Sequence, residues 1–264
     1  SGALNARHRN NQIKEFSVDI EEFALGDSWV HGLDPRTKIL VTALFSVVVA
    51  VNDHLPSTAP SLLLPMALIA CARLSIRRLL ARLAVVNGFV AFIWLFLPFT
   101  TPGHTIYAFG PLTIQSEGVY NALLISLKAN SIILMVIALM GTSSVFALVH
   151  ALSHLGIPNK LVHLFFFSFR YIHVIHAEYH RLANAMKMRG FKPKTNAHTY
   201  RAYAYLVGML LVRSFDRSKR ILQAMKCRGF KGKFYILHHY EMKIGDYALA
   251  GAGFAFTVLL WAFR

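Results

Sequence analysis

The sequence predicts an all-α membrane protein with about five transmembrane helices and a helical region on the cytoplasmic side. Three observations lead to this fold class. Hydrophobic residues make up 55% of the 264 residues and charged residues only 15%, against about 25% charged residues in a soluble domain. The apolar residues gather in runs that approach the length of a bilayer-spanning helix, about 20 residues. The Arg and Lys residues, which give a formal net charge of +16, cluster between these runs.

Five apolar runs are predicted to span the membrane, after a polar cytoplasmic segment of residues 1–36. They comprise residues 37–51, 58–74, 83–99, 119–140 and 247–263. The first run is short, so a neighbouring helix or a locally thinner bilayer must help it to cross. The chain is therefore divided into residues 1–36, a membrane region of four helices in 37–141, a helical segment in 142–246, and a last transmembrane helix in 247–264.

The positive charges between the runs predict the topology. Residues 52–57 and 100–118 contain no Lys or Arg and are placed outside. The loop around the end of the second run is placed inside together with the N-terminus, because it carries four arginines: Arg73, Arg77, Arg78 and Arg82. Residues 142–246 then lie inside, and the C-terminus emerges outside.

The inside segment is predicted to hold three helices, in residues 143–155, 160–189 and 200–228. Gly156-Ile157-Pro158 breaks the first from the second. A fully solvated helix would not need the run Phe165-Phe166-Phe167. Part of this segment is therefore expected to lie in the membrane or directly under it.

A ten-residue phrase occurs twice in this segment, as AMKMRGFKPK in residues 185–194 and AMKCRGFKGK in residues 224–233. A Gly just past a helix can adopt the left-handed conformation that closes it, here Gly190 and Gly229. Each copy then presents one arginine, Arg189 or Arg228, at the tip of a capped helix. Lys187 and Lys226, in the last turns, complement the negative end of the helix dipole. Arg181 and Arg220 each lie four residues before the start of a copy, at equivalent positions. Two ordinary basic helix ends would explain either copy alone, but the repetition favours paired docking points.

A second stretch, Leu33-Asp34-Pro35-Arg36-Thr37-Lys38, precedes the first predicted span. Asp34 suits the N-cap of a helix and Pro35 suits its first position. Arg36 and Lys38 oppose the positive end of the helix dipole, but they fit a helix start that faces the cytoplasm. A start signal for the first span is a sufficient interpretation of this stretch.

Other polar residues are given no functional role. Lys128 lies in the fourth apolar run, where a lysine that extends to the outer interface is favoured over a functional charge. His150 and His154, like His176 and His180, are four residues apart and share a helix face, as metal ligands can. Surface histidines are the preferred interpretation, and no metal site and no catalytic residue is assigned to the chain.

Together the two stretches resemble the transmembrane T component of energy-coupling factor (ECF) transporters, which are importers of the ABC type. The amino-acid sequence of residues 224–234 is most similar to the cobalt/nickel branch of that family. Glu117-Gly118, Thr142-Ser143 and residues 210–214 also agree, so that the resemblance covers about residues 31–235. Met188 and Cys227 stand before the Arg-Gly pairs, where the family prefers a small residue.

The resemblance implies a subunit that joins two ABC ATPase subunits to a substrate-binding membrane subunit, in a bacterial (inner) or archaeal plasma membrane. Arg189 and Arg228 would each dock into a groove on one ATPase, whose closure would bring the two tips together or tilt them. The sequence has no G-x-x-x-x-G-K-[ST] phosphate loop, so the chain is not expected to be an enzyme. ATP and Mg²⁺ would be cofactors of the partners, and the substrate metal would be held by the substrate-binding subunit.

Three alternatives remain at this stage. The first is a T component of a vitamin importer, and the second is a membrane enzyme that uses the His and Glu residues of 176–180 with a metal. The third is a membrane-tethered nucleic-acid binder, suggested by the net charge. The Phe clusters of the inside segment and the lack of a recognisable nucleic-acid-binding motif argue against this third alternative. No nucleic-acid partner is therefore expected.

Overall fold

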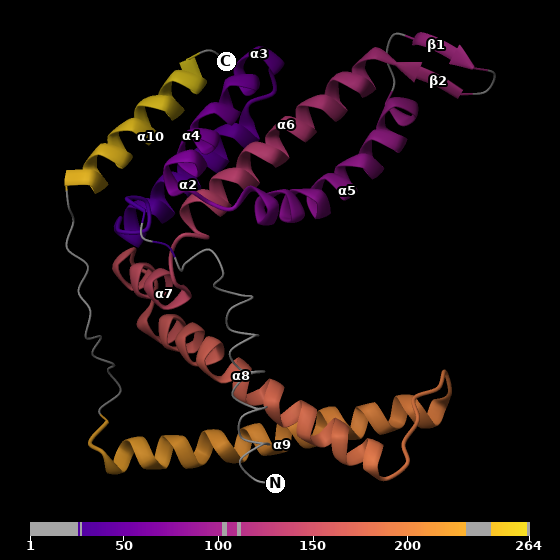
Figure 1. Ribbon diagram of the computed structural model, residues 1–264, viewed down its shortest axis with the longest axis vertical. Coiled ribbons are helices and arrows are strands. Elements are labelled where there is room, and N and C mark those ends of the chain that lie inside the picture. The colour runs from indigo at the N-terminus through magenta and orange to yellow at the C-terminus, as the bar shows by residue number, and fades with distance from the viewer. Residues whose placement is uncertain (1–25, 27, 102–104, 110–111, 231–243, 263–264) are drawn as a thin grey trace. The chain divides into compact units, whose positions relative to one another are not determined.

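The computed structural model describes residues 26, 28–101, 105–109, 112–230 and 244–262 (Figure 1). These residues form two compact units. We call the unit of residues 23–155 and 240–264 the helix bundle. We call the described part of the other unit, residues 156–230, the helix pair.

The helix bundle contains most of the apolar helices. In chain order these are α2 (Pro35–Val51), α3 (Leu55–Thr58), the short 3₁₀ helix η1 (Ala59–Leu62), α4 (Leu63–Ala72), α5 (Ile76–Thr100), α6 (Ser116–Leu139), α7 (Val145–His154) and α10 (Ile244–Ala262). An antiparallel hairpin of β1 (Thr105–Phe109) and β2 (Leu112–Gln115) joins α5 to α6. The hairpin is an addition to the predicted all-α fold, which the described residues otherwise confirm.

Four segments among the described residues are long and apolar enough to cross a membrane. They are Leu55–Ala72, Ile76–Thr100, Ser116–Leu139 and Ile244–Ala262, and they correspond to the last four predicted spans. The first predicted span is α2, whose 17 residues extend for about 25 Å. This is less than the about 30 Å of a hydrocarbon core, so α2 by itself does not reach across.

The core of the helix bundle lies where α2 packs against α6 and α10. Phe45 and Val49 of α2, Met135 and Leu139 of α6 and Leu260 of α10 are buried there. Hydrogen bonds between polar side chains add to this packing. Ser61 Oγ lies 2.7 Å from Ser131 Oγ, and Trp94 donates to Ser126 Oγ at 2.8 Å.

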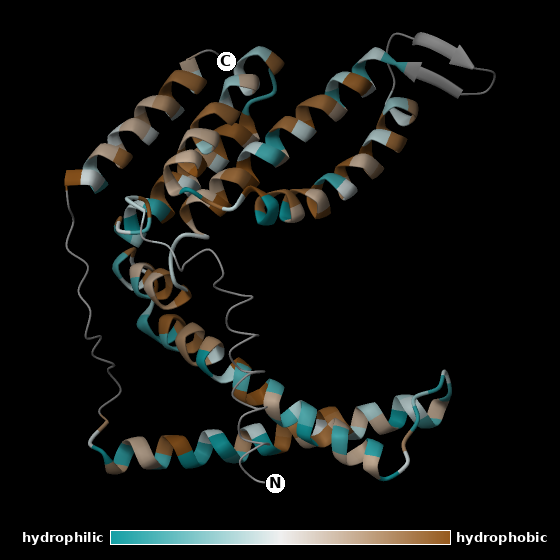
Figure 2. Ribbon diagram, viewed as in Figure 1, coloured by the Kyte–Doolittle hydropathy of each residue, from teal (hydrophilic) through white to brown (hydrophobic). Residues whose placement is uncertain are grey.

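By contrast, α5 exposes most of its apolar surface. Val85 is 78% exposed and Phe89 is 67% exposed, although both lie in a helix whose composition suits a membrane (Figure 2). In water such a surface would be costly, at about 25 cal/mol per Å². It is therefore suited to contact lipid or another apolar helix.

Lys128 of α6 reaches the end of α2. Its Nζ donates to the Ala50 carbonyl oxygen at 2.9 Å and to Asp53 Oδ1 at 3.0 Å, and Asp53 is largely exposed. The ammonium thus satisfies a carbonyl at the C-terminus of α2, as cations do at this end of a helix. This placement agrees with a lysine that extends from an apolar run to a polar end of the bundle.

The helix pair consists of α8 (Asn159–Met188) and α9 (Ala197–Cys227). Both helices mix apolar and polar residues (Figure 2), and they cross in Figure 1. The Phe191 ring contacts Tyr203, while Glu178 contacts Arg213 and Arg217. These contacts pair the end of α8 with the start of α9, so the two helices run antiparallel.

Candidate functional site

The first Arg-Gly phrase closes α8 with a complete Schellman motif. Gly190 has a φ of +81°, and its N–H donates to the Lys187 carbonyl at 3.0 Å. The Phe191 N–H donates to the Met186 carbonyl at 3.1 Å. These are the two bonds that define the motif, and they leave Arg189 at the cap position.

The second phrase closes α9 in the same way. Gly229 has a φ of +80°, and its N–H donates to the Lys226 carbonyl at 3.0 Å. The Phe230 N–H donates to the Met225 carbonyl at 3.0 Å, and Arg228 takes the cap position. The predicted glycine caps are therefore confirmed, and the repeated sequence produces a repeated geometry.

Both arginine tips are exposed to solvent, together with Gly190 and Gly229. Because α8 and α9 run antiparallel, the tips lie at opposite ends of the helix pair. A helix of 30 residues is about 45 Å long, and the tips are separated by a distance of that order. Each tip can thus be bound by its own partner without interference from the other.

The other basic residues of the two phrases differ in their surroundings. Lys187 and Lys226 lie exposed in the last turns of α8 and α9. Arg220 is exposed as well, whereas Arg181 donates to Glu178 Oε2 at 2.9 Å. This bond lies within α8 and holds the Glu178 carboxylate from its own helix, a contact that the sequence analysis, grouping Arg181 with the helix tips, did not foresee.

Glu178 is the electrostatic centre of the helix pair. Its side chain, only 9% exposed, accepts from Arg181 and Arg213 and lies 3.8 Å from Arg217 Nη2. The hydrogen bond from Arg213, and then the charges of the three guanidinium groups, hold the pKa of Glu178 below its ordinary value of 4.5, although burial acts in the opposite direction. Sequence analysis considered Glu178 only as part of a possible metal cluster and missed its contacts with the arginines. The available signal was that residues 159–230 contain two acidic residues, Glu178 and Asp216, among many basic ones.

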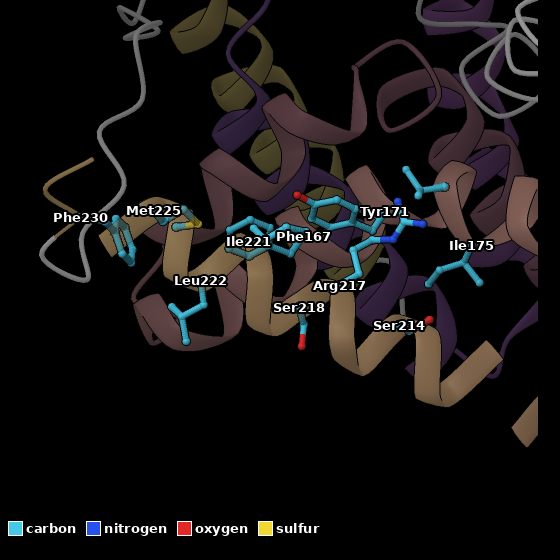
Figure 3. A pocket seen from close by; sticks show the side chains of 11 residues that line it. Phe167, Tyr171, Ile175, Ser214, Arg217, Ser218, Ile221, Leu222, Met225 and Phe230 are labelled. Carbon is cyan, nitrogen blue, oxygen red and sulfur yellow. The ribbon is translucent and has the colours of Figure 1, made fainter. Parts of the chain in front are cut away.

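An apolar groove of about 350 Å³ lies between the same two helices (Figure 3). Phe167 and Tyr171 of α8 line it, and Arg217 borders it from α9. Met225 and Phe230, both from the second phrase, also line it. The groove thus extends from Arg217 of the Glu178 cluster to Phe230, which follows the second arginine tip directly in sequence.

In the helix bundle, the Asp34–Lys38 stretch forms a buried polar junction. Lys38 is fully buried, and its Nζ donates to Ser143 Oγ at 2.7 Å and to the Thr142 carbonyl and Oγ1 at 3.4 and 3.3 Å. Thr142 and Ser143 belong to the corner between α6 and α7. Lys38 therefore ties the start of α2 to this corner, rather than marking a membrane face with an exposed charge.

The two carboxylates near Lys38 complete this junction. Asp34 caps α2 by accepting from the Arg36 N–H at 2.9 Å, with Pro35 in the first turn, as predicted. The Asp34 N–H in turn donates to Asp246 Oδ1 of α10 at 2.6 Å. Both carboxylates attract the Lys38 ammonium electrostatically, while Arg36 Nε lies 3.9 Å from Asp34 Oδ1.

The histidine pairs behave differently. His150 in α7 is buried, and its ring stands edge-on to that of His154. His176 and His180 lie on the exposed side of α8, with their Nε2 atoms 3.2 Å apart. Among the described residues, no group of three or more His, Cys, Asp or Glu side chains is placed to hold a metal ion.

Replacing Lys38 tests the buried junction. Lys38→Met removes the buried ammonium that both carboxylates attract, and removal of one partner from a buried charge network costs about 3–5 kcal/mol. We expect a clear fall in the thermal unfolding temperature of the detergent-solubilised protein. Lys226→Met, at an exposed position, is the matched control, and equal unfolding temperatures for both variants would contradict the junction.

Acid titration tests the Glu178 cluster. Because the folded pKa is lowered, the cluster's full stabilisation is present above the unfolded pKa and is lost as the pH falls through the folded pKa. We expect Glu178→Gln to lower the free energy of unfolding by about 2 kcal/mol at neutral pH. This difference from the unsubstituted protein should shrink below about pH 4.5 in a series of thermal unfolding curves.

Asp216→Asn is the control for this titration, because Asp216 is the other acidic residue of the helix pair and is exposed. Its effect should be small at every pH. A Glu178→Gln deficit that stayed constant into the acid range would contradict a lowered pKa.

Comparison with known proteins identifies the family. The family model described as cobalt transport protein, CbiQ, matches residues 26–236. The energy-coupling factor transporter transmembrane protein EcfT of Leuconostoc gelidum subsp. gasicomitatum is 26% identical over 260 residues, which cover 92% of this chain and 97% of that protein. The protein of the same name from Heliobacterium modesticaldum is 29% identical, over 81% of this chain and 85% of its own length. That from Bacillus subtilis is 26% identical, over 82% and 86%. The chain therefore belongs to the cobalt transport protein family, as a transmembrane component of the energy-coupling factor type.

Proposed function

We propose that this protein is the coupling subunit of an ECF-type ABC importer in the plasma membrane. It links two ATPase subunits, which carry ATP and Mg²⁺, to a membrane subunit that binds the substrate. The chain itself is not an enzyme in this proposal. Its N-terminus, its helix pair and both arginine tips face the cytoplasm, as the positions of the basic residues predict.

The observation that carries this proposal is the pair of identically capped, exposed arginine tips at opposite ends of one helix pair. Two equivalent ATPase subunits present the same groove twice, and a protein that binds both needs the same feature twice. The planar guanidinium group of arginine binds a carboxylate through two parallel hydrogen bonds, a geometry that lysine does not reproduce. Arg189 and Arg228 are accordingly the proposed docking residues, with Gly190 and Gly229 fixing their position.

The antiparallel arrangement also restricts how motion of the ATPases is transmitted. A continuous helix keeps its length, so ATPase closure cannot move the two tips along the axes of α8 and α9. It would instead tilt the helices or change the angle at which they cross. Both motions that the sequence analysis allows, approach of the tips and tilting, would then arise from rotation of the helices about their contact.

For the substrate, we propose Co²⁺ or Ni²⁺. The amino-acid sequence of the second Arg-Gly phrase supports the cobalt/nickel branch of the family. The description of the matching family model, cobalt transport protein, supports it as well. The second candidate is a vitamin, because the relatives are named only as transmembrane proteins of ECF transporters, without a substrate.

Charge reversal at the tips tests the docking role. We expect Arg189→Glu and Arg228→Glu to reduce co-purification with the ATPase subunits and substrate uptake at least tenfold each, because an unpaired charge at such an interface costs about 2 kcal/mol or more. Membrane insertion should remain normal. Arg189→Lys and Arg228→Lys should be impaired less, because they keep the charge but lose the planar fork.

The matched control for charge reversal is Arg201→Glu, at an exposed position of α9 outside both phrases. It should leave ATPase binding intact. The docking role would be refuted by a double Arg189→Glu, Arg228→Glu variant that still co-purified with its ATPases and imported normally.

Uptake measurements test the substrate. Cells that express the chain with its own ATPase and substrate-binding partners should accumulate radioactive Co²⁺ or Ni²⁺, and the double charge-reversal variant should not. Accumulation of a vitamin, without metal uptake, would instead assign the chain to the vitamin branch.

A further inference from the structure

We propose that His176 and His180 form a two-ligand site for a divalent first-row transition-metal ion on the exposed face of α8. The site is separate from both arginine tips and from the Glu178 cluster. It does not depend on the proposed transport function, because it rests on the geometry of one helix alone.

The distance between the two ring nitrogens fits a single metal ion. His176 Nε2 and His180 Nε2 lie 3.2 Å apart, and the two ring planes meet at 80°. Imidazole nitrogens bind such ions at about 2.0–2.1 Å, and two bonds of this length to nitrogens 3.2 Å apart enclose an angle of about 100°. This angle lies between the values for octahedral and tetrahedral coordination, so the separation suits one ion once each ring turns its Nε2 lone pair toward a shared point beside the Nε2–Nε2 line.

The helix keeps the two rings in this position. Residues four apart share one face of an α-helix, and α8 runs unbroken from Asn159 to Met188. His180 is exposed and His176 is partly exposed, so an ion from solution can reach both Nε2 atoms. Water would complete its coordination.

Glu178 does not act as a third protein ligand. Glu178 lies between the two histidines in sequence, but its carboxylate is engaged by Arg181, Arg213 and Arg217. This agrees with the absence, within the described residues, of any cluster of three metal-binding side chains. The proposed site therefore binds an ion reversibly rather than as a permanent structural metal.

The chemistry of the donors selects the class of ion. Two neutral imidazoles suit Cu²⁺, Ni²⁺, Zn²⁺ and Co²⁺, whereas Mg²⁺ and Ca²⁺ prefer oxygen ligands. Among the first four, the affinity should be highest for Cu²⁺ and should rise from Co²⁺ to Ni²⁺. The same separation of 3.2 Å also suits a direct hydrogen bond between a protonated and an unprotonated ring nitrogen, which is the competing interpretation.

Metal titration of the purified full-length chain distinguishes the two interpretations. Isothermal titration with Ni²⁺ and Cu²⁺ should show a binding event that His176→Ala and His180→Ala each weaken at least about tenfold, because loss of a ligand should cost no less than loss of a ligand's hydrogen-bond partner, about 10–100-fold. His163→Ala and His198→Ala, which remove single histidines of the same helix pair, should leave the event unchanged. Metal binding by the remaining histidines contributes equally to every titration, because every variant retains them.

Electron paramagnetic resonance of bound Cu²⁺ supplies a second readout. The spectrum should show two equivalent nitrogen ligands, and one fewer in His180→Ala. His176→Gln and His180→Gln provide replacements if an alanine variant folds poorly, and circular dichroism checks helix content in each case. Equal Ni²⁺ affinity in the unsubstituted protein and the His176 variants, or equal losses in the His163 and His198 controls, would overturn the site. These readouts involve neither ATPases nor uptake, so their failure is distinct from failure of the proposed function.

Discussion

The buried ammonium of Lys38 is the constraint on which the helix bundle depends. A charge removed from water costs several kcal/mol unless the protein supplies partners for it. Here the partners come from three separate places in the chain: Asp34 before α2, Thr142 and Ser143 at the α6–α7 corner, and Asp246 at the start of α10. The lysine can be buried only when all three are assembled, so its burial fixes where these helices begin and end relative to one another.

The helix pair uses the same principle with the charges exchanged. In the bundle one cation is satisfied by acidic and polar groups, whereas in the helix pair one carboxylate, Glu178, is satisfied by Arg181, Arg213 and Arg217. The surrounding segment is strongly basic, and like charges at close range would otherwise separate the helices. A single anion at the crossing point relieves this repulsion and fixes the register of α9 against α8.

Sequence analysis predicted those features that depend on neighbouring residues. The last four spans follow from runs of apolar residues, and both Schellman motifs follow from a glycine placed directly after a basic last turn. The N-cap at Asp34 is equally local. The features that it missed depend on distant contacts, such as the Lys38 hydrogen bonds across 104 and 105 residues and the Arg213–Glu178 contact across 35 residues. The β1–β2 hairpin was missed for another reason, because its segment has prominent turn residues but strands too short to stand out.

The position of Glu178 turns the helix pair into a lever with two arms. Arg189 lies 11 residues beyond Glu178 on α8, and Arg228 lies 15 residues beyond Arg213 on α9, which gives arms of about 16 and 22 Å. A change of about 10° in the crossing angle would swing the ends of these arms by about 3–4 Å, roughly the length of one hydrogen bond. Small rotations at a single carboxylate are thereby converted into displacements of several ångströms at both helix tips.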